Sequence, residues 1–133
     1  DYGMRESMKE YGKSKLLLTT FAAELARKLV HNGQIDVSVH ALCPGPVNTN
    51  IAREAPWWAK PFAKLILVVF FRSPVRAARP VLFLSCSPSI EGQTGLYLHM
   101  DSRKDISASA ADPTAGERLW ECSQRLAQNG PYS

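Results

Sequence analysis

The 133-residue sequence has few cysteines, no long apolar run and no block of like charge. Its three cysteines, Cys43, Cys86 and Cys122, are widely spaced and form no CxxC pair, which argues against a disulfide framework and a zinc site. This pattern favours a reducing intracellular compartment, either cytoplasmic or at a membrane. The longest apolar run, Leu65–Phe71, has seven residues, far fewer than the roughly 18 needed to span a bilayer. The net charge of +4 is spread among acidic residues, so nucleic acid is not an expected partner.

The composition is typical of a globular protein, because 45% of the residues are hydrophobic and 21% are charged. A chain of this length fits one domain. The N-terminal stretch DYGMRESMKE has neither an initiating Met nor the apolar core of a signal peptide. We therefore expect residues 1–133 to form a single partial domain within a longer protein.

The first half of the chain predicts a helix, a strand and a loop. Apolar residues recur at helical spacing between Tyr11 and His31, and Asn32-Gly33 is a typical helix stop. The segment Ile35–Cys43 alternates apolar and polar residues, as a half-buried strand does. The prolines and glycine of PGPVNTN then end the strand in a loop. The charged residues expected on the polar side of the helix are Lys13, Glu24, Arg27, Lys28 and His31.

The second half predicts further helices and one more strand. Prolines break the segment from residue 51 to residue 72, and Ser73-Pro74 is a typical start for a helix that runs to about Ser85. A short strand is expected at Leu96–Met100, followed by a polar surface loop, SRKDISASAADPTAG. A closing helix, Pro113–Gln128, has Leu119, Trp120, Cys122 and Leu126 as its apolar positions. This order of elements indicates half of an α/β layered domain.

Tyr11 and Lys15 form the first candidate site, because four residues are about one helical turn and place both side chains on one face. A phenol is a poor base at neutral pH unless a nearby positive charge stabilises the phenolate. With an ammonium beside it, a tyrosine can donate a proton to a carbonyl oxygen or accept one from an alcohol. The alternative is a structural aromatic residue at the start of a helix beside a solvated lysine.

The loop after the strand is the second candidate site. Ligands of open α/β sheets bind beyond the carboxyl ends of the strands, where backbone N–H groups are left without partners. Pro44 and Gly45 would permit a close approach of a ligand to this backbone. The alternative is a plain turn between a strand and a helix.

Taken together, Tyr11-x-x-x-Lys15, the strand that ends in PGPVNT and the late GLYL strand resemble the C-terminal half of the short-chain dehydrogenase/reductase family. The closing LWECSQRL and the length of the middle segment are similar to its retinol-dehydrogenase-like branch. The resemblance implies the C-terminal half of a Rossmann-like doubly wound parallel sheet. It also implies an oxidoreductase that transfers a hydride between NAD or NADP and a hydrophobic, retinol-like or steroid-like alcohol or carbonyl.

The resemblance further implies roles for individual residues. Tyr11 would be the catalytic acid and base, and Lys15 would activate it and hold the ribose of the cofactor. Pro44 and Gly45 would belong to the cofactor loop, in which the backbone of Val47 and the hydroxyl of Thr49 contact the nicotinamide end.

The apolar middle segment is open to several interpretations. Trp57, Trp58 and Phe62, with the run that follows them, could line a substrate pocket or cover it. They could equally be core residues, or a patch that rests on a membrane surface or a partner. The three histidines, His31, His40 and His99, show no metal-ligand spacing, so no metal site is expected.

The sequence also departs from the family pattern. It contains neither G-x-x-x-G-x-G nor G-x-G-x-x-G, and the catalytic Ser of the family would fall before Asp1. We therefore expect the isolated chain to bind dinucleotides poorly and to be inactive. The alternative hypothesis is a truncated, non-enzymatic remnant that binds a partner or forms a homodimer through its exposed helix.

Overall fold

The computed structural model describes residues 3–45 and 73–129. These residues fall into two compact units. The first unit comprises the described residues up to Ala41, Gly92–Tyr97 and those from Asp105 onward, and the second comprises the described residues from Leu42 to Glu91 with Leu98–Lys104. The predicted broken helices between residues 51 and 72 lie outside the described residues, as do five of the predicted site residues: Val47, Thr49, Trp57, Trp58 and Phe62.

The predicted first helix is present as α1 (Met4–Lys28), but it begins seven residues earlier than expected. Its last turn carries Arg27 and Lys28, whose charges suit the negative end of a helix dipole. Asn32 and Gly33 do not end this helix. They have φ angles of 52° and 78° and form the two-residue turn between the antiparallel strands β1 (Val30–His31) and β2 (Gln34–Ile35), since paired positive φ angles match the twist of a hairpin.

The predicted strand Ile35–Cys43 is only partly correct. The structure keeps Ile35 in β2 and forms β3 from Ala41–Cys43, whereas residues 36–40 are not in a strand. The alternating pattern alone did not show that Val39 would bond to a side chain: its N–H group donates to the hydroxyl of Thr94, at 2.9 Å.

A three-stranded sheet has the order β3, β4 (Tyr97–His99), β5 (Ser102–Lys104). The N–H of Ala41 donates to the carbonyl of Leu96, and further along both strands the N–H of Met100 donates to the carbonyl of Cys43. Because these bonds advance in the same direction on both strands, β3 and β4 are parallel, as predicted. β4 and β5 are sheet neighbours joined by two residues, so they are antiparallel and the sheet is mixed.

The prediction of a polar loop after β4 is wrong, because this segment contains β5 and a one-turn helix, α4 (Ala108–Ala111). The side chain of Ser107 accepts the N–H of Ala110 and so caps α4. β5 is exposed along its whole length. Polar residues therefore suit this strand at the edge of the sheet. Because they show no alternation of apolar and polar residues, the sequence did not predict a strand here.

The last two long helices are confirmed. α3 spans Pro74–Cys86, and its N-cap Ser73 accepts the N–H of Arg76. A 3-10 turn, η2 (Pro88–Ile90), follows it. α5 has the predicted bounds, Pro113–Gln128, and its N-cap Asp112 accepts the N–H of Thr114. In both helices a capping side chain precedes a proline at the first helical position, a strong local start signal.

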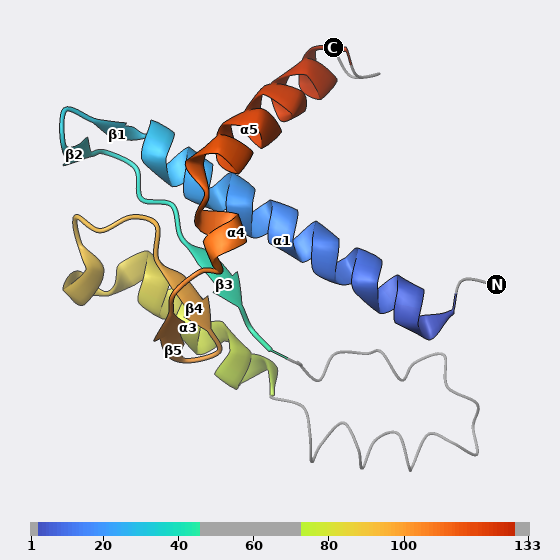
Figure 1. The fold of residues 1–133 in the computed structure, drawn as a ribbon. Coiled ribbons are helices and arrows are strands. Elements are labelled where there is room, and N and C mark those ends of the chain that lie inside the picture. The colour runs from blue at the N-terminus through green and yellow to red at the C-terminus, as the bar shows by residue number, and fades with distance from the viewer. Residues whose placement is uncertain (1–2, 46–72, 130–133) are drawn as a thin grey trace, which may run out of the picture. The chain divides into compact units, whose positions relative to one another are not determined.

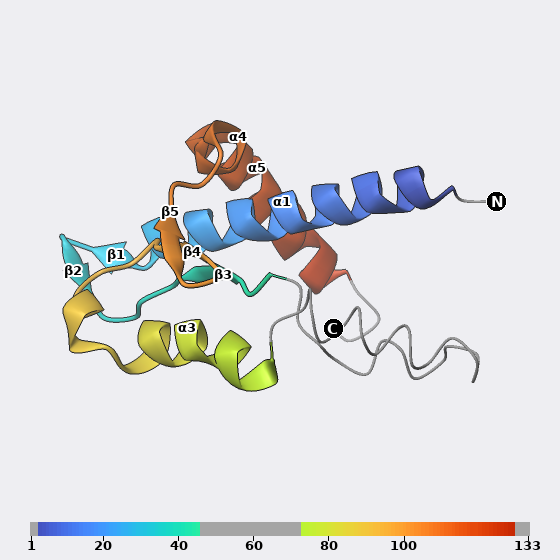
Figure 2. The ribbon, with the colours of Figure 1, turned by 90° about the horizontal axis from the view of Figure 1, so that it is seen from below.

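Within the first unit, α4 and α5 pack against the C-terminal half of α1 (Figures 1 and 2). Phe21 of α1 stacks on Trp120 of α5, with ring centroids 5.3 Å apart. Gly116 is the buried residue of α5 at this crossing. The predicted apolar face of α5 is partly wrong: Leu119 and Trp120 are half-buried, but Cys122 and Leu126 are exposed.

Gly116→Ala should lower the free energy of unfolding by about 1 kcal/mol, although alanine is the better helix former by a similar amount. A Cβ atom there would lie 2.6 Å from both Glu24 Oε2 and Arg27 Nη2 and 3.2 Å from Glu24 Cβ, so these paired groups must move. Gly12→Ala is the matched control, because Gly12 lies inside α1 with no atom within 4 Å of the added Cβ. Urea denaturation should show the control stabilised by roughly 0.5–1 kcal/mol. Stabilisation by both substitutions would contradict the close approach of α1 and α5.

Candidate functional site

Tyr11 and Lys15 lie on the same face of α1, as predicted. The ammonium nitrogen of Lys15 is 5.4 Å from the centre of the Tyr11 ring. Both side chains are exposed, and 65% of Tyr11 is accessible to solvent. The described residues therefore bring the pair together and leave both side chains exposed to solvent.

Further along α1, the face that carries this pair lines a small hollow with Ala41 of β3 and with residues just before β3 and β4, so we call it the strand-facing side. Successive residues turn by about 100°, so Tyr11, Lys15, Ala22 and Ala26 fall within roughly a quarter of the circumference. Ala22 lines a small hollow with neighbouring α1 residues and with Val39, Ala41, Gly95, Leu96 and Ile106 of the same unit. A Cβ atom on Gly95 would be 3.9 Å from the Cβ of Ala26. The phenol and the ammonium thus project from the strand-facing side of α1.

The predicted cofactor loop begins in the second unit. Gly45 has a φ of 72°, a conformation that favours glycine, and an added Cβ would lie 2.6 Å from Met100 Cε. Pro44 before it is exposed. The positive φ and the close approach of Met100 favour a glycine at this position, two residues after the end of β3. The roles of Val47 and Thr49 stay predictions.

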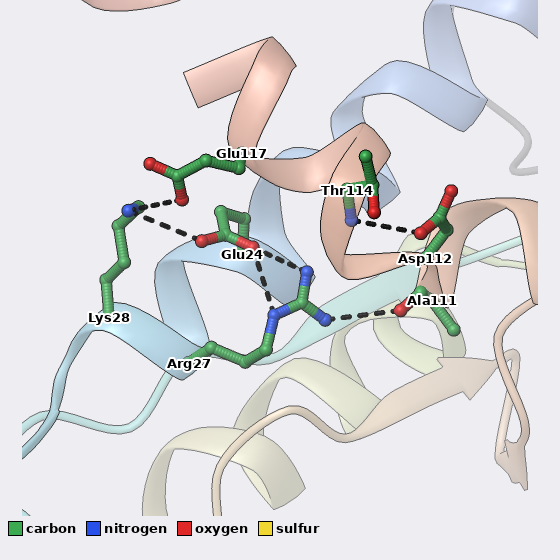
Figure 3. Close-up of polar contacts among 7 residues, drawn as sticks. All are labelled: Glu24, Arg27, Lys28, Ala111, Asp112, Thr114 and Glu117. Carbon is green, nitrogen blue, oxygen red and sulfur yellow. Dashed lines mark hydrogen bonds and ion pairs between the residues drawn. The ribbon is translucent and has the colours of Figure 1, made fainter. Parts of the chain in front are cut away.

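The sequence placed Glu24 on the solvent side of α1, and this prediction is wrong. Only 5% of Glu24 is exposed. Its carboxylate accepts hydrogen bonds from Arg27 Nε at 3.0 Å and Nη2 at 2.5 Å (Figure 3). Lys28 bridges it to α5, at 3.4 Å from Glu24 Oε1 and 2.7 Å from Glu117 Oε2. The sequence shows the Glu-x-x-Arg-Lys spacing within one helix. It does not show that Glu117 of α5 pairs with Lys28.

Further contacts make this ion cluster (Glu24, Arg27, Lys28 and Glu117) a joint between α1 and the C-terminal helices. Arg27 Nη1 donates to the carbonyl of Ala111, at 3.3 Å, and the Lys28 ammonium is 5.4 Å from the ring centre of Trp120. Burial alone would raise the pKa of the Glu24 carboxyl, but the hydrogen bond and charge of Arg27, helped by Lys28, outweigh burial and lower it. The joint holds the C-terminal half of the helix that carries Tyr11 and Lys15.

Other candidate chemistry is sparse in the part of the chain that the structure describes. No group of three His, Cys, Asp or Glu side chains there could hold a metal ion. The three cysteines are free, and Cys86 and Cys122 are exposed. Among the described helices, none is long and apolar enough to cross a membrane.

Comparison with known proteins assigns the chain to a family. It is 34% identical to retinol dehydrogenase 14 of Mus musculus over 116 residues, which cover 86% of the chain and 34% of that protein. It is also 34% identical to dehydrogenase/reductase SDR family member 13 of Homo sapiens over 130 residues, 97% of the chain and 34% of that protein. The chain belongs to the short-chain dehydrogenase/reductase family. No family model matches it.

Within the short-chain dehydrogenase/reductase family the similarity extends to polyprenol dehydrogenase of Mus musculus, 31% identical over 90% of the chain and 36% of that protein. The chain spans about a third of the length of the curated relatives that it matches. The family assignment confirms the resemblance to the retinol-dehydrogenase-like branch and the partial Rossmann-like α/β fold.

Proposed function

We propose that this chain supplies the acid/base half of an oxidoreductase that transfers a hydride between a nicotinamide cofactor and a hydrophobic alcohol or carbonyl. The observation that carries the proposal is the placement of Tyr11 and Lys15, one turn apart on the strand-facing side of α1 with 5.4 Å between the ammonium and the ring centre. A proton donor and a cation at this separation suit carbonyl reduction, in which negative charge develops on the substrate oxygen.

Two features of the chain support NAD or NADP as the proposed cofactor. The Lys15 ammonium of the first unit offers up to three N–H donors, which would suit ribose hydroxyls. In the second unit, the backbone at Gly45 lies two residues beyond the end of β3, and ligands of α/β sheets ordinarily bind beyond strand ends. When bound, the cofactor supplies the hydride for reduction or accepts it in oxidation. Tyr11 donates the proton to the carbonyl oxygen in reduction and removes the alcohol proton in oxidation. Lys15 stabilises the phenolate that Tyr11 forms in the first direction.

The names of two relatives support the proposed substrate class. Retinol dehydrogenase and polyprenol dehydrogenase are named for hydrophobic alcohols. The chain contains Trp57, Trp58 and Phe62 close together in an apolar segment, which would suit the lining of an apolar pocket. We therefore propose a retinol-like or steroid-like alcohol, or the matching carbonyl compound, as substrate.

The proposal is tested by assaying a longer protein that carries this chain beside the 133-residue chain alone. No glycine-rich pyrophosphate turn occurs in the 133 residues, so the isolated chain should show weak dinucleotide binding by calorimetry and no turnover. The longer protein should oxidise retinol-like or steroid-like alcohols with NAD or NADP. Tight dinucleotide binding by the longer protein without any turnover of apolar alcohols or carbonyls would oppose the proposed substrate class.

A second candidate function is supported by the exposed apolar surface of α1. Met8, Leu16, Leu17 and Leu18 are all exposed, and the three leucines point in different directions around the helix. An exposed cluster of large apolar side chains on a helix ordinarily marks a surface that another element or partner covers. As the alternative we propose a non-enzymatic module that binds a partner, including a second copy of the chain, through this helix. Sedimentation of the 133-residue chain tests this alternative. A self-associated chain that Leu17→Glu makes monomeric would support the binding module, and a chain that is monomeric without the substitution would oppose self-association.

A further inference from the structure

Side chains as well as backbone groups join residues 39–40, just before β3, to residues 94–96, just before β4. Val39 and Thr94 bond twice: the N–H of Val39 donates to Thr94 Oγ1 at 2.9 Å, and that hydroxyl donates to the carbonyl of Val39 at 3.3 Å. The N–H of Leu96 donates to the ring nitrogen Nδ1 of His40, at 3.3 Å. We call these four residues, Val39, His40, Thr94 and Leu96, the clasp.

Backbone bonds of the parallel ladder flank the clasp. The N–H of Gly95 donates to the carbonyl of Val39 at 2.7 Å, and the N–H of Ala41 donates to the carbonyl of Leu96 at 2.8 Å. The imidazole of His40 thus takes a position in the ladder that a main-chain carbonyl would ordinarily fill. It secures the segment between β2 and β3, where residues 36–40 form no strand of their own.

The bond to Leu96 fixes the protonation state of His40. A backbone N–H can only donate, so Nδ1 must present its lone pair and the ring proton must lie on Nε2. Leu96 is 5% exposed, so little water can replace the ring if the bond is lost. A proton on Nδ1 would set two donors against each other and leave a buried N–H without an acceptor, which is unfavourable.

We propose that His40 is a pH-sensitive latch that holds the segment before β3 against Leu96 near neutral pH and releases it in mild acid. The latch is local, since the two backbone bonds on either side of it involve no titratable group. It is independent of the proposed oxidoreductase function.

Burial lowers the pKa of His40 below the ordinary value of 6.5, and no charged group among the described residues contributes to this shift. Well above pH 6.5 the imidazole is neutral in both the folded and the unfolded chain. As the pH falls below 6.5, the unfolded chain takes up a proton before the folded chain does, so the free energy of unfolding declines. The decline ends once the pH has passed the lowered folded value, where His40 is charged and the latch is open.

Amide hydrogen exchange by NMR on the full 133-residue chain tests the latch. Between about pH 7.5 and about pH 5, the protection factor of the Leu96 amide should fall about tenfold, the equivalent of one lost hydrogen bond. The amide of Ala26 in α1 should keep its protection. In His40→Asn the side-chain carbonyl can accept the same N–H at any pH, so the protection of Leu96 should no longer depend on pH.

Two further measurements separate the latch from a general acid effect. His31→Asn removes an exposed histidine and should leave the pH dependence of Leu96 unchanged. Nitrogen chemical shifts of the wild-type His40 ring should show Nδ1 without a proton at neutral pH. A proton on Nδ1 at neutral pH, or an equal loss of Leu96 protection in His40→Asn, would overturn the proposal.

Discussion

Replacing Tyr11 with Phe in a longer protein that carries this chain should lower kcat by about 10²–10⁴-fold, the usual contribution of a general acid or base. Cofactor affinity should change little, because the phenol acts on the transferred proton. Lys15→Ala should weaken both turnover and cofactor binding, since the ammonium stabilises the phenolate and also reaches the ribose. Steady-state kinetics with a hydrophobic alcohol, together with a dinucleotide titration, measure both effects.

Lys13→Ala is the matched control for this pair of substitutions. Lys13 is exposed on the same helix and pairs with Glu10 at 2.8 Å, but it points about 160° away from Tyr11. It should leave turnover and cofactor affinity unchanged. A Tyr11→Phe protein that turns over as fast as the wild type would make Tyr11 a structural residue and favour the partner-binding alternative.

Replacing Glu24 with Ala should lower the free energy of unfolding by about 2 kcal/mol. Breaking a fully buried ion pair ordinarily costs about 3–5 kcal/mol, because the remaining charge is left without a partner. Here the side chains of Arg27 and Lys28 are 38% and 31% exposed, so water can partly compensate them and the loss is smaller. Urea denaturation of the full chain, with tryptophan fluorescence as the probe, measures the change.

Glu10→Ala is the control for the substitution at Glu24. Glu10 forms an ion pair with Lys13 on the same helix, but both side chains are more than half exposed, so its loss should cost at most about 0.5 kcal/mol. Equal effects of the two substitutions would show that Glu24 does not join α1 to α5.

The pH dependence of the Glu24 effect follows from its lowered pKa. The stabilisation is present above the ordinary value of 4.5 and is lost as the pH falls through the lower folded value. The difference in stability between the wild type and Glu24→Ala should therefore shrink in acid.

The helix starts and the residue pair that were predicted correctly from the sequence have local signals, whereas the parallel pairing of β3 and β4 came from the family resemblance. Ser73-Pro74 and Asp112-Pro113 each combine a capping side chain with a proline, and both helices begin at these prolines. The pairing of Tyr11 with Lys15 likewise depends only on the repeat of one helix.

The features that were missed depend on residues far apart in the sequence. Glu24 is buried because α5 brings Gly116 and Glu117 to it, more than 80 residues later. Residues 36–40 leave the strand pattern where Thr94 and His40 supply side-chain bonds in place of backbone ones. No periodicity in a single segment encodes such a partner, so these sites required the structure.

The central claim, that this chain carries the proton-transfer pair of a hydride-transferring enzyme, is tested most directly by following the isotope. A longer protein that carries the chain is incubated with a hydrophobic carbonyl compound and a reduced nicotinamide that bears deuterium at the hydride-donating carbon. The account predicts deuterium on the carbinol carbon of the alcohol product, formed by the wild type and about 10²–10⁴-fold more slowly by Tyr11→Phe. Unlabelled product from the wild type, or labelled product formed equally fast by Tyr11→Phe, would contradict it.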